Sequence, residues 1–121
     1  MRPGSSIINI TSVLGLTTAG LPQAAYASSK AGLIGLTRDL AQQWTGRKGI
    51  RVNALAPGYF ESEMTDQFEA DYVDRTVIPR MLYGRLGRAK ELNAALIFLA
   101  SDASSYVTGI TLPVDGGMLV T

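Results

Sequence analysis

Tyr26 and Lys30 lie four residues apart in one segment of the chain, and Ser12 precedes the tyrosine by fourteen residues. On a helix, residues i and i+4 share a face, so this phenol and this ammonium can lie in one site. A free phenol, with a pKa of about 10, transfers protons poorly at neutral pH, whereas a nearby cation lowers that pKa. If Ser12 binds a substrate oxygen, Tyr26 can exchange a proton with that oxygen. The three side chains together therefore indicate an acid–base site for interconverting an alcohol and a carbonyl.

The tyrosine–lysine pair alone also fits a simpler interpretation. A half-buried tyrosine on an amphipathic helix is often accompanied by a lysine whose stem covers apolar surface. The surrounding motifs decide between the two interpretations. In chain order they are Ile7–Ser12, the segment 26–37 that contains the pair, Ile50–Ala54, Pro57-Gly58 and Gly109–Gly117.

In this order and at these intervals, the motifs resemble the C-terminal half of a classical short-chain dehydrogenase/reductase, and the resemblance covers essentially the whole chain. It implies that Ser12 orients the substrate oxygen, that Tyr26 is the general acid/base, and that Lys30 also holds the nicotinamide ribose. It further implies NAD or NADP as the cofactor, bound only in the full-length context. The other cofactor-binding residues that it implies are Pro57 and Gly58 in a turn against the nicotinamide, Phe60 through its backbone, and Ser62, a serine where the family has threonine, near the phosphates.

The 121 residues contain no glycine-rich turn between a strand and a helix that could hold a pyrophosphate. Gly15 and Gly20 have unsuitable spacing, and Gly32 and Gly35 fall inside an expected helix. The family's ribose-selecting residue and its catalytic asparagine would lie before Met1. We therefore expect residues 1–121 to form a single partial domain, the catalytic half, without the nucleotide-binding half.

The hydrophobic pattern predicts an α/β fold, namely the C-terminal half of a Rossmann-type, doubly wound parallel sheet. Near-continuous isoleucine in the first strand indicates burial on both faces of a parallel sheet. Between the second strand and Gly87 we expect one or two short helices. The expected elements are strands 6–12, 51–56 and 109–114 and helices 24–44 and 90–100, with about three strands joined by crossover helices.

Each long helix is expected to turn an apolar stripe inward. Gly46 and Gly49 are expected to end the first helix. The expected stripes are Leu33, Leu36, Leu40 and Trp44 on the first helix and Leu92, Ala95, Leu96 and Leu99 on the last.

Composition excludes several classes of protein. A net charge of +1 gives no case for nucleic acid as a partner, and no apolar run is long enough to span a membrane. With neither Cys nor His, the chain has no disulfide and no ligand set typical of a transition metal. We expect a cytoplasmic location.

Six acidic residues lie between positions 61 and 74 with no basic residue among them. We interpret this run as a solvated helix face; the alternative is a mobile acidic lid over the site. Arg80, Arg85 and Arg88 could bind an anionic substrate, but the structural interpretation, with Arg85 paired to Glu91, is favoured. Asp115-Gly116-Gly117 is typical of a turn rather than of a metal site.

The leading functional hypothesis is a piece of an NAD(P)-dependent oxidoreductase that interconverts a secondary alcohol and a ketone. The residues after Pro57 look most like members acting on sugar acids, such as gluconate 5-dehydrogenase, and those after Lys30 look equally like 3-oxoacyl-carrier-protein reductases. In full-length form we expect a homo-oligomer, a dimer or tetramer. The alternative is a catalytically silent half-domain that acts only by association, because the isoleucine-rich first strand would be left as an unpaired edge.

Overall fold

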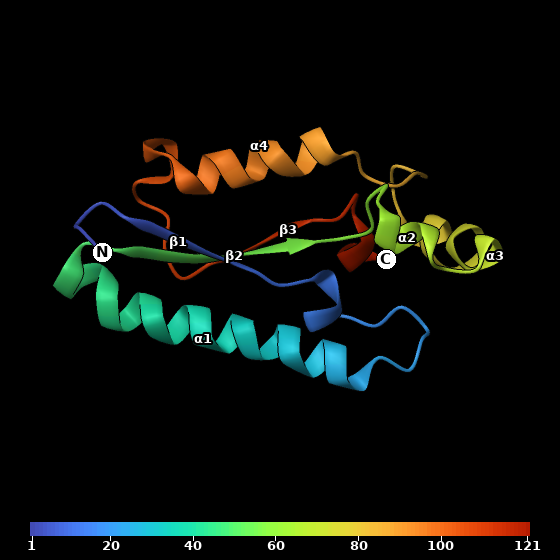
Figure 1. Cartoon of the computed structure of the whole chain (residues 1–121), viewed down its shortest axis with the longest axis horizontal. Coiled ribbons are helices and arrows are strands. Elements are labelled where there is room, and N and C mark those ends of the chain that lie inside the picture. Colours follow the sequence, from blue (N-terminus) through green and yellow to red (C-terminus); the bar gives the residue numbers. More distant parts are fainter.

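The computed structural model describes residues 1–121 and shows a parallel three-stranded sheet between two long helices (Figure 1). The strands are β1 (Ser6–Ile10), β2 (Arg51–Pro57) and β3 (Thr111–Val114), in the spatial order β1-β2-β3. Helix α1 (Ala24–Lys48) connects β1 to β2 and covers one face, while α4 (Ala89–Ala100) precedes β3 and covers the other. The predicted α/β fold with three parallel strands is confirmed.

Short helical segments fill the region between β2 and α4, as the sequence predicted. They are α2 (Glu63–Asp66), α3 (Ala70–Tyr72), the π-helical turn Val73–Val77 and the 3₁₀ turn Ile78–Arg80. Figure 1 shows them at the end of the molecule where β2 and β3 point. Further 3₁₀ turns are Val13–Gly15, Asp102–Ser104 and Met118–Val120. No helix combines the length and the apolar character that crossing a membrane requires.

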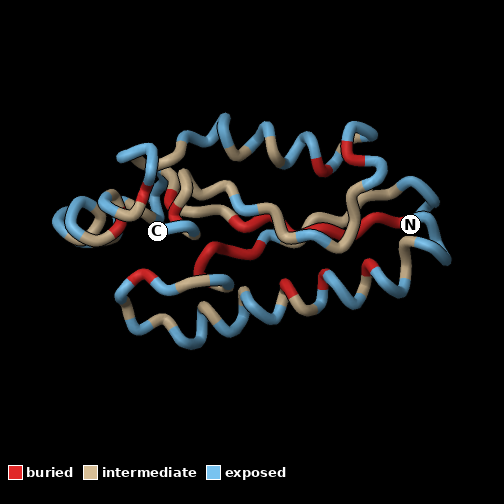
Figure 2. Tube along the Cα trace, turned by 180° about the vertical axis from the view of Figure 1, so that it is seen from behind, coloured by how far each residue is buried: buried red, intermediate tan, exposed pale blue.

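The central strand β2 is buried at every position from Arg51 to Ala56, as the continuous red segment of Figure 2 shows. Its two polar side chains have partners. Asn53 donates to the Val107 carbonyl at 2.9 Å and accepts from the Ile110 amide at 3.2 Å. A buried side-chain amide needs hydrogen-bond partners. The partners of Asn53 are backbone groups of the segment just before β3, so these bonds fix the position of that segment.

Arg51 ties β2 to the end of α4. Its guanidinium donates to the carbonyls of Leu99 at 3.2 Å and Ser101 at 3.1 Å, and to the Ser104 hydroxyl at 2.7 Å. A cation at a helix C-terminus is stabilised by the helix dipole and satisfies its free carbonyls. Arg51 therefore fixes α4 over the sheet.

Helix α1 is longer than the sequence predicted. It passes through Gly46 and ends at Gly49, whose φ of 66° is left-handed and whose amide donates to the Thr45 carbonyl at 3.0 Å. A glycine inside a helix costs only about 1 kcal/mol against alanine, so Gly46 alone does not end it. A left-handed residue does end a helix, because it turns the chain away from the axis.

The predicted apolar stripe of α1 is partly wrong. The buried residues are Ile34, Thr37 and Ala41, whereas Leu36 is 46% exposed. Small side chains allow α1 to approach the sheet closely, and the Thr37 hydroxyl accepts from the Asn9 amide of β1 at 2.9 Å. The three other predicted stripe residues, Leu33, Leu40 and Trp44, are half-buried.

Similar deviations occur elsewhere. On α4, Leu99 is fully buried, but Leu96 is 38% exposed. Strand β1 ends two residues earlier than predicted and is half-buried rather than buried on both faces, and β3 begins at Thr111. In each case the sequence pattern gave the element correctly, while its ends and its degree of burial depend on the neighbouring elements.

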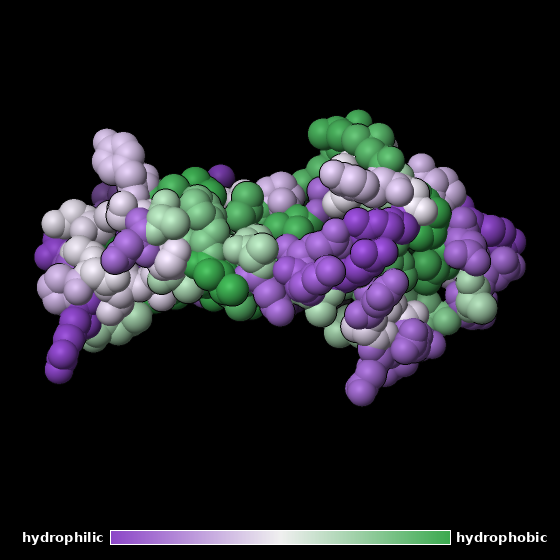
Figure 3. Space-filling model, turned by 90° about the horizontal axis from the view of Figure 1, so that it is seen from above, coloured by the Kyte–Doolittle hydropathy of each residue, from purple (hydrophilic) through white to green (hydrophobic).

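Strand β1 pairs only with β2, so its other edge has no partner strand within the chain. Beside that edge, Ile10 is 47% exposed. The face that carries α4 also shows apolar surface, green in Figure 3, where Leu96, Ile97 and Phe98 are 38, 65 and 39% exposed. An unpaired edge and a contiguous apolar surface both favour association with another chain.

We therefore expect the chain to self-associate as its concentration rises, and sedimentation velocity over a concentration series measures this. Ile97→Lys should shift the distribution toward monomer, because it places a charge on the exposed face of α4. The control Gln42→Lys adds the same charge at an exposed polar position of α1, on the other side of the sheet. A monomer at every concentration would contradict the expectation, and equal behaviour of the two variants would exclude the α4 face as the contact.

Candidate active site

A cleft of about 740 Å³ lies beyond the carboxyl ends of β1 and β2, beside the first turns of α1. In open parallel α/β sheets, ligands bind outside the carboxyl ends of the strands. The cleft brings together all seven residues predicted from the sequence as site residues, namely Ser12, Tyr26, Lys30, Pro57, Gly58, Phe60 and Ser62.

Ser12 stands where β1 gives way to a 3₁₀ turn. Its buried hydroxyl caps that turn by accepting from the Leu14 amide at 3.1 Å. A hydroxyl has two lone pairs and one hydrogen, so Ser12 keeps its hydrogen to donate to a ligand. The preceding residue, Thr11, donates from its hydroxyl to the Lys30 carbonyl at 2.7 Å and so fixes the turn against α1.

Gly15 ends this turn in close contact with α1. A Cβ built on Gly15 would lie 3.0 Å from both the Lys30 carbonyl carbon and the Ala31 amide nitrogen. The neighbouring atoms are backbone and cannot rotate away, so a side chain at position 15 would have to push the turn and α1 apart by a few tenths of an ångström. From the sequence, Gly15 was only a loop glycine with unsuitable spacing for a phosphate loop, and its positioning role was missed.

Tyr26 and Lys30 lie on one face of α1, as their spacing predicted. The Lys30 Nζ is 5.6 Å from the centroid of the Tyr26 ring and donates to the Ile10 carbonyl at 3.2 Å. An ammonium has three hydrogens, so two remain for a ligand. Tyr26 is 39% exposed and lines the cleft, so its phenol is accessible to a small molecule.

The floor of the cleft is the turn after β2. The Gly58 amide donates to the Val114 carbonyl at 2.9 Å, and a Cβ on Gly58 would lie 2.7 Å from the Asp115 Cα. The ring of Phe60 rests on Gly87, where a Cβ would lie 2.4 Å from the ring. Gly58 and Gly87 thus fix the course of the chain past Pro57.

Ser62 begins α2 and takes part in a reciprocal cap. Its hydroxyl accepts from the Thr65 amide at 3.3 Å, and the Thr65 hydroxyl accepts from the Ser62 amide at 2.9 Å. The cap is typical of a helix start. Ser62 lines the cleft, and its contact with cofactor phosphates stays a prediction.

Three aromatic residues join the region around α2 and α3 to the loop before Tyr26. The ring centroids of Phe68 and Tyr72 are 5.3 Å apart, and those of Tyr59 and Phe68 are 6.1 Å apart. The Tyr72 hydroxyl donates to the Ala19 carbonyl at 2.7 Å and lies 3.5 Å from the Tyr59 hydroxyl. Burial and the contact with Tyr72 raise the pKa of Tyr59, so Tyr59 stays neutral.

Sequence reasoning missed Gln23 and Gln67, two amides that also line the cleft. Gln23 ends the loop before α1, and Gln67 follows α2 directly. Neither position belongs to a motif that the sequence analysis used. The one feature of the sequence that could have indicated Gln23 as a cleft residue is its position three residues before Tyr26.

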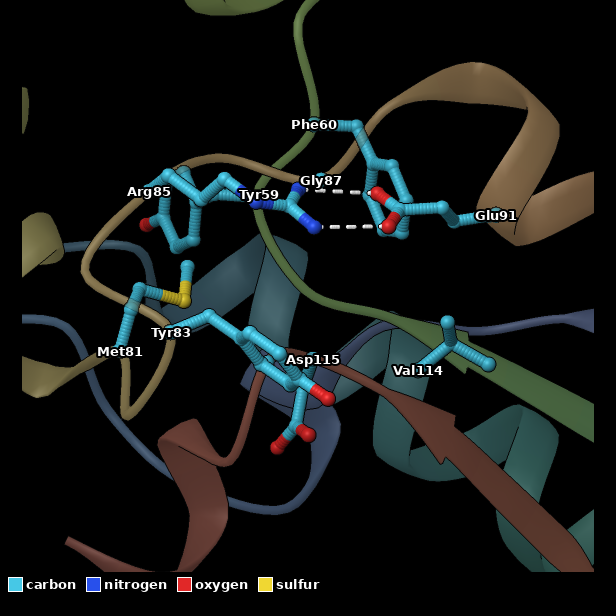
Figure 4. A pocket seen from close by; sticks show the side chains of 10 residues that line it. Tyr59, Phe60, Met81, Tyr83, Arg85, Gly87, Glu91, Val114 and Asp115 are labelled. Carbon is cyan, nitrogen blue, oxygen red and sulfur yellow. Dashed lines mark hydrogen bonds and ion pairs between the residues drawn. The ribbon is translucent and has the colours of Figure 1, made fainter.

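Arg80 and Arg85 have structural partners, as favoured from the sequence, whereas the exposed Arg88 contributes only its backbone amide, which donates to Glu91. Figure 4 shows a smaller cavity of about 150 Å³ beside which Arg85 binds both carboxylate oxygens of Glu91, at 2.8 and 3.0 Å. Arg80 donates to the Thr18 carbonyl, in the loop before α1. The Asp115 carboxylate accepts from the amides of Gly117 at 3.0 Å and Leu119 at 2.9 Å, as expected of a turn.

Glu91, in the first turn of α4, also caps the start of this helix, since its carboxylate accepts from the Arg88 amide at 2.8 Å. The contact with Arg85, and next the Arg88 amide, lower the pKa of Glu91 from 4.5 to about 2. A carboxylate whose pKa is lower in the folded state stabilises the fold above its unfolded pKa and loses this effect as the pH falls through its folded pKa.

We therefore expect the wild-type chain to melt at a higher temperature than Glu91→Gln at pH 7, and this difference to shrink as the pH falls from 4.5 to about 2. Glutamine keeps an oxygen for the Arg88 amide but has no charge for Arg85. Glu91→Ala, which loses both contacts, should melt lowest at pH 7. Thermal denaturation followed by circular dichroism measures all three. A Glu91→Gln chain as stable as wild type at pH 7 would show that the ion pair adds nothing.

Comparisons with known proteins agree with this geometry. The family model described as enoyl-(acyl carrier protein) reductase matches residues 1–119. The 3-oxoacyl-[acyl-carrier-protein] reductase FabG of Thermotoga maritima is 45% identical over 116 residues, which cover 95% of this chain and 46% of that protein.

Solved structures match as well. A gluconate 5-dehydrogenase from Burkholderia cenocepacia, in complex with NADP and tartrate, is 42% identical with a TM-score of 0.87, over 96% of this chain and 45% of that one. A variant of a short-chain dehydrogenase/reductase from Serratia marcescens has a TM-score of 0.89 at 34% identity, over 98% of this chain and 47% of that one. The chain thus spans about half the length of the relatives that it matches.

Proposed function

The chain belongs to the short-chain dehydrogenase/reductase family, an oxidoreductase family, and on that premise we propose that it carries the proton-transfer residues of an NAD(P)-dependent enzyme that interconverts a secondary alcohol and a ketone. The observation that carries this proposal is the convergence of Ser12, Tyr26 and Lys30 on one cleft at the carboxyl ends of parallel strands. Its volume of about 740 Å³ lies in the usual range for small-molecule sites.

In this proposal Ser12 and Tyr26 act on the same substrate oxygen. Ser12 donates the hydroxyl hydrogen that its cap to Leu14 leaves free, and so orients a ketone. Tyr26 then gives its phenolic proton to the oxygen as the carbonyl is reduced, and accepts it back in the direction of alcohol oxidation. The Lys30 ammonium, held by the Ile10 carbonyl beside the Tyr26 ring, stabilises the negative charge that develops on the phenol oxygen.

The residues present also fit a nicotinamide cofactor, which supplies or accepts the hydride when bound. The two free hydrogens of Lys30 suit ribose hydroxyls, and the turn at Pro57 and Gly58 offers a wall without a long side chain. Phe60 and Ser62 continue this wall toward the α2 start. We propose that residues 1–121 form the catalytic half of the domain and that the nucleotide-binding half lies outside them. A cytoplasmic location and assembly into a dimer or tetramer stay predictions.

The 121-residue chain alone should not reduce a ketone. Catalysis requires a hydride donor and a carbonyl held in near-attack geometry, and the strand–helix connections of this chain offer no glycine-rich turn for a pyrophosphate. An assay of NADPH oxidation with several ketones measures this, with Tyr26→Phe as the background. Turnover above that background would contradict the half-domain proposal.

The residue roles are testable in a chimera in which this chain replaces the matching residues of the Thermotoga maritima reductase. Tyr26→Phe should lower kcat by about 10²- to 10⁴-fold with little change in the KM for NADPH, because general acid catalysis operates in the transition state. Lys30→Ala should lower kcat and also raise the KM for NADPH, because Lys30 is assigned two roles. Tyr106→Phe, at a fully exposed tyrosine, is the matched control. An unchanged kcat in Tyr26→Phe would remove the general-acid assignment.

A second candidate function, association without catalysis, is favoured by the unpaired edge of β1. Titration of the chain and of the chimera with NADPH, followed by nicotinamide fluorescence, separates the two candidates. If the chimera neither binds NADPH nor turns over a ketone while the chain still associates, the association function is the better account.

A further inference from the structure

We propose that Gln23 is a specificity-determining residue of the reaction, and that its side-chain amide binds a second oxygen of the substrate, on the β carbon relative to the reacting carbonyl. This inference rests on the proposed function, because it adds a substrate contact in the same cleft. Groups outside residues 1–121 can add further contacts to the substrate, but they leave this one in place.

Gln23 continues the row of site residues along α1. It precedes Tyr26 by three residues and Lys30 by seven, a spacing that places side chains on one face of a helix. All three side chains line the cleft, and Gln23 is half-buried. The amide therefore stands one helical turn from the phenol that the proposed function assigns as the acid.

The Gln23 side chain has no hydrogen-bond partner within the chain. A residue just before a helix commonly caps it with a side-chain oxygen, but Gln23 makes no such bond. The polar lining side chains that do have partners are Thr11, Ser12, Lys30, Tyr59, Ser62 and Thr65. Gln23 thus resembles Tyr26 and Gln67, the other polar side chains of the cleft that the fold leaves free for a ligand.

Main-chain contacts on both sides hold Gln23 in place. Its carbonyl accepts from the Ala27 amide at 2.8 Å and so begins the hydrogen-bond ladder of α1. Upstream, Arg80 and Tyr72 bind the carbonyls of residues 18 and 19 in the loop that ends at Gln23. Only the side-chain torsions of Gln23 remain to be fixed by a ligand, and a group that is already positioned loses little freedom on binding.

The helical spacing indicates which oxygen Gln23 would bind. Three residues along a helix correspond to a rise of about 4.5 Å, so an oxygen held by Gln23 lies roughly this far from the oxygen held by Tyr26. Oxygens on adjacent carbons lie closer together than this, whereas a β oxygen on an extended chain reaches such a distance. An amide has both hydrogens and an acceptor oxygen, so Gln23 can bind either a β hydroxyl or a β carbonyl.

Two ketones of similar size test this assignment in the chimera with the Thermotoga maritima reductase. 4-Hydroxybutan-2-one carries the β oxygen, and pentan-2-one has a methyl group in its place. The chimera should favour the hydroxy ketone in kcat/KM, and Gln23→Met should reduce this preference about three- to tenfold, the usual effect of one neutral hydrogen bond. Methionine keeps the length of the side chain without the amide. The ratio of the two kcat/KM values cancels whatever the reductase half contributes equally to both variants.

Two further glutamines make the comparison specific. Gln42→Met removes an exposed amide of α1 outside the cleft lining and should leave the ratio of the two ketones unchanged. Gln67→Met removes the other free amide of the cleft, on the opposite wall. A change of the ratio in Gln67→Met together with none in Gln23→Met would overturn the assignment of Gln23.

The outcomes separate this inference from the proposed function. If Gln23→Met lowers kcat/KM for both ketones equally, Gln23 has a structural role only, and the inference fails while the function stands. If Tyr26→Phe turns over both ketones as fast as the chimera, the function fails and the inference fails with it.

If the chimera turns over neither ketone, binding to the 121-residue chain decides. The side-chain NH₂ signal of Gln23 in ¹⁵N spectra, assigned by its absence from Gln23→Met, should shift with 4-hydroxybutan-2-one and not with pentan-2-one. No shift with either ketone, or an equal shift with both, would overturn the inference.

Discussion

The turn that follows β1 lies directly on the backbone of α1, and the geometry of the cleft depends on this contact. Three interactions cross it. Gly15 approaches the Lys30–Ala31 peptide so closely that a side chain would push the two apart, the Thr11 hydroxyl donates to the Lys30 carbonyl, and the Lys30 ammonium donates to the Ile10 carbonyl. Two of these contacts hold main-chain atoms of α1. The backbone separation of Ser12 from Tyr26 and Lys30 is therefore set by packed main-chain atoms. A bound ligand would change only the rotamers of these side chains.

The opposite wall depends on a second close approach, between the ends of β2 and β3 at Gly58 and Asp115. The polar groups inside the sheet support this arrangement. Arg51 and Asn53 satisfy the carbonyls and amides of the segment that leads from α4 into β3, and no buried side-chain nitrogen or oxygen lacks a partner. Because a buried polar group without a partner is costly, this satisfied network specifies one path for the chain between α4 and β3.

The sequence predicted the elements, and where the candidate site residues stand on them, better than it predicted their surroundings. Tyr26 and Lys30 are four apart on a helix, and strands with continuous apolar residues place Ser12 and Pro57 at their carboxyl ends, so local rules suffice for these positions. The burial of α1 was harder to predict, because Leu36 is exposed while Thr37 and Ala41 face the sheet. Packing distance decides that choice, and it depends on residues of β1 far away in the sequence. Gln67 of the cleft was missed for the same reason, since the course of the chain around α2 depends on tertiary contacts at Phe60 and Gly87.

The bonds from Tyr72 to the Ala19 carbonyl and from Arg80 to the Thr18 carbonyl join two stretches of chain that flank the cleft, the loop 16–23 and the segment 61–80. One stretch leads into Tyr26, and the other supplies Met64 and Phe68 to the cleft lining and carries the exposed acidic residues. Because both acceptors are backbone carbonyls, the bonds depend on the donors at positions 72 and 80, so a change at either position in the segment 61–80 also acts on the loop that leads to Tyr26.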